Sequence, residues 1–101
     1  MLFRSGQRTA RERIAYLAVF LVQRAIETGL ARGNSVTLTV TQTQIADMLG
    51  LSLVHTNRTM QTLRQSNLIM WNLSEIQIAD MDAAREYARF DYPQDTRRPY
   101  L

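Results

Sequence analysis

The residues that decide the fold are 41–67, TQTQIADMLGLSLVHTNRTMQTLRQSN, which have the pattern of two short helices joined at a glycine. Thr41 can accept hydrogen bonds from the N–H groups that open a helix, and Gln44, three residues later, completes a capping box. Gly50 is expected to end that helix, because a residue without a Cβ atom adopts the left-handed backbone conformation at little cost. The stretch therefore predicts a helix-turn-helix.

Both helices are expected to be amphipathic. In the first, Ile45, Met48 and Leu49 fall on one face at helical spacing and are predicted to be buried. Ser52 is the expected N-cap of the second helix. The buried face of that helix comprises Thr56, Thr59, Met60 and Leu63, and its polar, cationic faces carry His55, Asn57, Arg58, Gln61 and Arg64. Such a helix, held across a glycine turn, is the geometry that presents side chains to the major groove of DNA.

The particular string strengthens this interpretation. Residues 50–69, GLSLVHTNRTMQTLRQSNLI, resemble the C-terminal DNA-binding domain of the cyclic-AMP receptor and fumarate-nitrate-reduction regulator superfamily of bacterial transcription factors. The likeness runs from about residue 8 to residue 92 and includes LIMWNLSEIQIAD, residues 68–80, and DMDAAREYARFD, residues 80–91. It implies a bacterial transcription regulator that binds double-stranded DNA, and it leaves RNA polymerase open as a further partner.

The flanking residues predict the winged form of the motif. Residues 10–30 carry apolar side chains at helical spacing and predict the longest helix of the chain. Residues 35–40 alternate apolar and polar and predict a strand, and residues 68–71 and 75–78 predict a hairpin. The expected fold is a winged helix-turn-helix, mainly α with a small β wing.

The chain is expected to form one domain. A last helix, capped by Asp80 or Asp82, closes a winged helix-turn-helix domain that spans residues 10–92. Residues 1–9 are expected to be a flexible lead-in, and residues 93–101 a loose tail. A length of 101 residues with 46% hydrophobic residues suits one compact domain of this kind.

Charge and composition restrict the location and the partners. The net charge of +3 mildly favours a polyanionic partner. The absence of cysteine rules out disulfides and thiolate metal sites and is compatible with a reducing cytoplasm, the expected location. The longest apolar run, residues 14–22, is far shorter than the ~20 residues that span a bilayer, so no membrane partner is expected.

Base-reading residues are expected in the first turns of the second helix, because only these reach base edges in this motif. The candidates are Leu53, Val54, Asn57 and Arg58. Arg58 can donate two hydrogen bonds to guanine O6 and N7, and Asn57 can pair with adenine N6 and N7. By resemblance, Arg58 matches the guanine-reading arginine of the family. Many members carry a glutamate at the position of Val54, which cannot accept a hydrogen bond from cytosine N4 and can only pack on a thymine methyl group.

Phosphate contacts are expected at the N-termini of the two helices, whose N–H groups and positive dipole ends attract anions. The candidates are Thr41, Gln42, Thr43, Ser52 and His55. Thr41 and Ser52 can instead serve only as caps, and His55 can be a plain solvated residue. The tip of the wing, residues 72–75, carries no cation, so the wing is expected to contribute little.

No catalytic chemistry is expected. His55 is the only histidine, and no cysteine or clustered carboxylate lies near it in sequence. The sequence also lacks a glycine-rich phosphate loop. The chain is therefore expected to be no enzyme and to bind no metal or cofactor.

The first helix leaves two questions of assembly open. Its apolar band, widened by Tyr16, Val19 and Phe20, is broader than a small core requires, which predicts a weak homodimer through this face. A monomer is expected instead if the C-terminal helix covers the band. The rival function is a winged-helix module for protein contact that uses the Tyr16 and Phe20 face and binds no DNA.

The resemblance also implies parts that these 101 residues do not contain. The family has an N-terminal sensor domain and a long dimerisation helix. The sequence is therefore expected to be either an excised domain or a naturally short regulator, without an effector site of its own.

Overall fold

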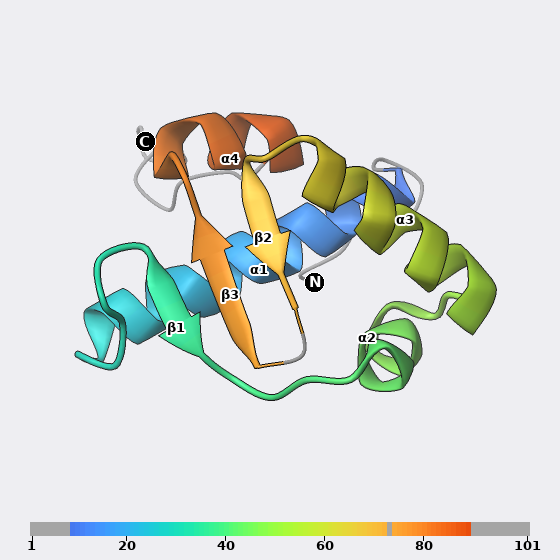
Figure 1. The fold of residues 1–101 in the computed structure, drawn as a ribbon, viewed down its shortest axis with the longest axis horizontal. Coiled ribbons are helices and arrows are strands. Elements are labelled where there is room, and N and C mark those ends of the chain that lie inside the picture. Colours follow the sequence, from blue (N-terminus) through green and yellow to red (C-terminus); the bar gives the residue numbers. More distant parts are fainter. Residues whose placement is uncertain (1–8, 73, 90–101) are drawn as a thin grey trace, which may run out of the picture.

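The computed structural model describes residues 9–72 and 74–89. Within these ranges it shows a winged helix-turn-helix: four helices and a three-stranded antiparallel sheet. The elements are α1 (Ala10–Glu27), β1 (Ser35–Thr37), α2 (Gln42–Leu49), α3 (Leu53–Gln65), β2 (Ile69–Trp71), β3 (Glu75–Ile78) and α4 (Met81–Ala88). Figure 1 shows α1 running behind the sheet, with the α1–β1 turn at one end of the molecule and α2 and α3 at the other. The predicted fold class is confirmed. The expected lead-in and tail lie outside the described residues, apart from Thr9.

The central element is α1. Thr9, expected in the lead-in, is instead its N-cap and forms a capping box with Glu12. The helix ends at Glu27 rather than at residue 30, because Gly29 adopts a left-handed conformation (φ +80°) and the N–H of Leu30 turns back to the carbonyl of Ala25 at 2.8 Å. Its buried side chains form much of the core: Ile14, Ala15, Leu17, Ala18, Val19, Val22 and Ala25.

The sheet covers one side of α1 in the order β1-β3-β2. Ile76, in the central strand, pairs with Val36 on one side and Trp71 on the other, and its side chain is buried. The strand predicted over residues 35–40 is shorter, because its last residue, Thr37, already lies opposite the first residue of β3. Beyond it Leu38 donates one hydrogen bond to the carbonyl of Ser74 (3.0 Å), and the chain then leaves the sheet toward α2.

The helix-turn-helix has the predicted caps. Thr41 and Gln44 form the capping box of α2, and Gly50 ends the helix in a left-handed conformation (φ 69°, ψ 32°). The prediction for Met48 was wrong, since its side chain is 55% exposed. The buried face of α2 is made by Ile45, Ala46 and Leu49, and Met48 lies to one side of it.

A side chain of α1 holds α2 in place. The guanidinium of Arg13 donates a hydrogen bond from Nη2 to the carbonyl of Leu49, at the C-terminal end of α2. Such carbonyls have no partner within their own helix and need one from elsewhere. The contact therefore ties the end of α2, just before the turn, to the central helix.

The last helix closes the other flank of α1. Asp80, one of the two predicted caps, accepts from the N–H of Ala83, and Ala84 and Ala88 are buried. Arg85 donates from Nη2 to Oε1 of Gln23 in α1 at 2.9 Å. Arg89 approaches Glu12, also in α1, at 4.0 Å.

The packing of α4 on α1 reduces the exposed apolar surface of α1 through which a homodimer was predicted. Glu12, Val19 and Gln23 share one face of α1 at helical spacing, and Arg85 of α4 and its C-cap residue Arg89 contact the two ends of that face. Val19 is completely buried, while Tyr16 packs on the core and Phe20 is half-buried. The part left to solvent is therefore smaller than the sequence indicated, and assembly itself stays a prediction.

Candidate nucleic-acid interface

The orientation of α3 is fixed by its buried face. Met60 and Leu63 are almost fully buried in the core shared with α1 and β2. Thr56 is completely buried as well, and its hydroxyl donates to the carbonyl of Ser52 at 2.9 Å. Thr59 donates in the same way to the carbonyl of His55 at 2.8 Å. The two threonines therefore pack inside without leaving a polar group unsatisfied, and the opposite face of α3 is turned to solvent.

The predicted base-reading residues are all exposed. Leu53 is 51% exposed and Val54 is 68% exposed, and both lie in the first turn of α3. Asn57 and Arg58 are exposed one turn later. The four side chains are thus accessible from one end of the helix, as base reading requires.

Asn57 is held by neighbouring amides. Its Nδ2 donates to Oε1 of Gln42, at the start of α2, at 2.9 Å, and its Oδ1 accepts from Nε2 of Gln61 at 3.4 Å. Each contact uses one of the two N–H donors or one of the two oxygen lone pairs of the amide, so a second donor and a second acceptor site remain for adenine. The contact with Gln42 therefore joins the start of α2 to α3, and base reading by Asn57 stays a prediction.

The two helix N-termini are capped as predicted. The hydroxyl of Thr41 accepts from the N–H of Gln44 at 3.0 Å, and the hydroxyl of Ser52 accepts from the N–H of His55 at 3.0 Å. Because a hydroxyl accepts through a lone pair, each still has its own O–H to donate to an outside oxygen. Capping and phosphate binding are therefore compatible at both positions. Thr43 is exposed on the first turn of α2.

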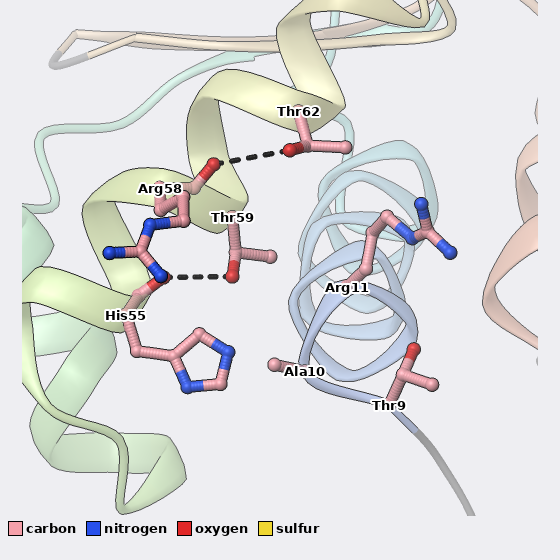
Figure 2. Close-up of a pocket in the computed structure, with 7 residues that line it drawn as sticks. All are labelled: Thr9, Ala10, Arg11, His55, Arg58, Thr59 and Thr62. Carbon is pink, nitrogen blue, oxygen red and sulfur yellow. Dashed lines mark hydrogen bonds between the residues drawn. The ribbon is translucent and has the colours of Figure 1, made fainter.

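An open depression of about 260 Å³ lies between the start of α1 and α3. It is lined by Thr9, Ala10, Arg11, His55, Arg58, Thr59 and Thr62 (Figure 2). Figure 2 shows the imidazole of His55 turned toward the beginning of α1, while the guanidinium groups of Arg11 and Arg58 point in different directions. The two arginines therefore spread positive charge along the surface and do not converge on a single anion.

Arg11 was not among the predicted site residues. It lies far from α3 in the sequence, and only the packing of α1 on α3 brings it beside His55. Arg64, predicted only as part of the cationic faces of α3, lines a second cavity, of about 190 Å³, together with Gln42 and Asn72. No local pattern in the sequence links Arg11 to α3.

The chemistry of the surface is that of polyanion binding. α3 contains a histidine and two arginines and no acidic residue. In the part of the chain that the structure describes, no three histidine or carboxylate side chains come together as metal ligands. None of the described helices is long and apolar enough to cross a membrane.

Fold and surface together define a winged helix-turn-helix of the DNA-binding type. Residues 12–87 match the family model of the Crp-like helix-turn-helix domain, so the chain belongs to this family of DNA-binding transcription-regulator domains. The match covers every described helix and strand, apart from the first two residues of α1 and the last of α4. Among curated proteins, no sequence matches the chain.

Proposed function

We propose that the chain binds double-stranded DNA in a sequence-specific manner, with α3 in the major groove. The observation that carries this proposal is the outer face of α3, which is exposed, cationic and free of acidic residues. It begins at a capped N-terminus beside a second capped helix, α2, so two positive dipole ends lie near the same surface.

Arg58 is the proposed source of specificity. It is exposed on the second turn of α3, within reach of base edges when the start of the helix enters the groove. Its guanidinium can donate two parallel hydrogen bonds to O6 and N7 of one guanine. Leu53 and Val54 contribute apolar contacts, and Asn57, positioned by Gln42, offers its second N–H donor and second lone pair to an adenine.

The phosphate contacts surround this base-reading end. The proposed contacts at the helix N-termini, where backbone N–H groups are free, are the caps Thr41 and Ser52 and the first residues of α2, Gln42 and Thr43. His55 and Arg11 extend the cationic surface to the start of α1. These contacts would hold the domain on the duplex without distinguishing sequences.

As a transcription regulator the protein would act in the bacterial cytoplasm, with RNA polymerase as a further partner. We also propose a weak homodimer through Tyr16 and Phe20, since two recognition helices one DNA turn apart bind more tightly than one. Sedimentation of the wild type beside Phe20→Glu tests the pairing. A wild-type monomer at high concentration, or a dimer unchanged by the substitution, would contradict it.

The test of DNA binding is selection of preferred sites from random duplexes, followed by titration of the selected site at two salt concentrations. We expect one enriched motif that contains a guanine, and an affinity that falls steeply with salt because phosphate contacts release counterions. A module for protein contact would enrich no motif and show no steep salt dependence.

A further inference from the structure

Two large apolar side chains are exposed to solvent at the start of α3. Leu53 is 51% exposed and Val54 is 68% exposed, although both occupy the first turn of a helix whose other apolar residues are buried. The Ser52 cap fixes this turn, because its hydroxyl accepts from the N–H of His55. Their exposure thus follows from a well-defined helix start.

Neither side chain can read a base through hydrogen bonds. In the major groove, the one apolar group that a base pair offers is the methyl group on C5 of thymine. Under the proposed function, Leu53 and Val54 lie on the turn that approaches base edges most closely. The chemical feature that they fit is therefore a pyrimidine that carries a methyl group on C5.

Val54 and Arg58 offer no favourable contact to unmodified cytosine. Cytosine presents an N4 amino donor to the groove, which needs an acceptor. Val54 itself has no acceptor atom, and Arg58, one turn later on the same face of the helix, can only donate. His55, the next residue, turns its ring toward the start of α1 (Figure 2). A cytosine against Val54 would offer no methyl group to the valine, and the valine would offer no acceptor to the N4 amino group.

We propose that Leu53 and Val54 form a detector of C5-methylated pyrimidines, so that the chain prefers 5-methylcytosine to cytosine and thymine to uracil at the same position. The methyl group of 5-methylcytosine sits on the same ring carbon as that of thymine and points into the same groove. Methylation of cytosine in the site would then strengthen binding. This inference rests on the proposed function, because it assumes that the start of α3 faces the bases.

A series of four pyrimidines at each position of the selected site tests the inference. Thymine and uracil differ only in the C5 methyl group, and 5-methylcytosine and cytosine differ in the same way. We expect one or two positions where removal of the methyl group weakens binding roughly fourfold within each pair, the effect of burying one such group. The same series is measured for Val54→Ala and Leu53→Ala, one of which should lose the methyl preference.

A matched control is Leu30→Ala. Leu30 is 73% exposed and belongs to the α1–β1 turn, at the opposite end of the molecule from α3 (Figure 1). Its removal takes away a similar exposed side chain and should leave the methyl preference unchanged.

The possible outcomes distinguish failure of this inference from failure of the proposed DNA binding. Absence of binding to any duplex would overturn the proposed function itself. Site-specific binding with equal affinity for methylated and unmethylated pyrimidines at every position would overturn the detector alone. So would a methyl preference that survives both Val54→Ala and Leu53→Ala, since other atoms would then read the methyl group.

Discussion

α3 and α4 both pack on α1, but they use their arginines in opposite ways. On α4, Arg85 forms an ion pair with Asp82 at 3.1 Å and donates to Gln23, and only 17% of its side chain is exposed. Arg58 lies exposed on α3, which has no acidic residue, and within the described part of the chain no carboxylate pairs with it. The difference teaches that counting basic residues does not identify a binding surface. A cation indicates a polyanion site where the neighbouring acids are missing.

The largest expected effect comes from Arg58→Ala. It should cost about 1–3 kcal/mol of binding free energy on the preferred site and relax the preference at one guanine, because the bidentate contact is lost. Titrations of the preferred site and of single-base variants measure both effects. Arg85→Ala is the matched control, an arginine removed from a helix on the same scaffold, and should leave DNA affinity unchanged. An equal loss on all sequences would make Arg58 a phosphate contact.

The second prediction concerns the turn at Gly50, which joins α2 to α3. Gly50→Val should lower the free energy of unfolding by about 1 kcal/mol or more, and Gly50→Ala should be milder. The cause is conformational: the backbone has φ +69°, while an added Cβ would meet nothing within 4 Å. Thermal unfolding of both variants measures the effect. Unchanged melting temperatures in both would contradict the role assigned to this glycine.

The third prediction concerns Arg85, the arginine of α4 that is paired within the protein. Arg85→Ala should reduce stability by about 0.5–1 kcal/mol, since it removes hydrogen bonds to Gln23 that link α4 to α1. The ion pair adds little, because Asp82 is 89% exposed and screened by solvent. Thermal unfolding measures the loss, with Asp82→Ala as the control that keeps the contacts to Gln23. A larger effect from Asp82→Ala than from Arg85→Ala would contradict this assignment.

The sequence predicted what depends on short spacings. The capping box of Thr41 and Gln44, the turn at Gly50 and the buried face of α3 are local, since each is decided within one or two helical turns. Met48 was misplaced because helical spacing alone does not say where the centre of a buried face lies in a helix of eight residues.

What the sequence missed depends on contacts between distant elements. The strand at residues 35–40 stops early because of where β3 begins. The apolar band of α1 is narrowed by α4, whose contacts with Gln23 and Glu12 involve residues far apart in the chain. The choice of site residues remains a prediction, and the structure adds Arg11 to it only through the packing of α1 on α3.

The smallest expected effect concerns Arg11, which extends the contrast between the arginines to α1. It lines the same depression as His55 and Arg58, yet its guanidinium points away from that of Arg58 (Figure 2). A side chain at the rim of the interface reaches the DNA backbone rather than a base, so Arg11→Ala should weaken binding about equally on every sequence. The salt dependence of the binding constant should also fall by about one phosphate contact. Titrations at several salt concentrations, on the selected site and on a scrambled duplex, measure both quantities. Arg24→Ala is the control, since Arg24 lies exposed in the last turn of α1, away from α3, and should change neither. A loss confined to the selected site would assign Arg11 to base reading, and an unchanged salt dependence would place it outside the interface.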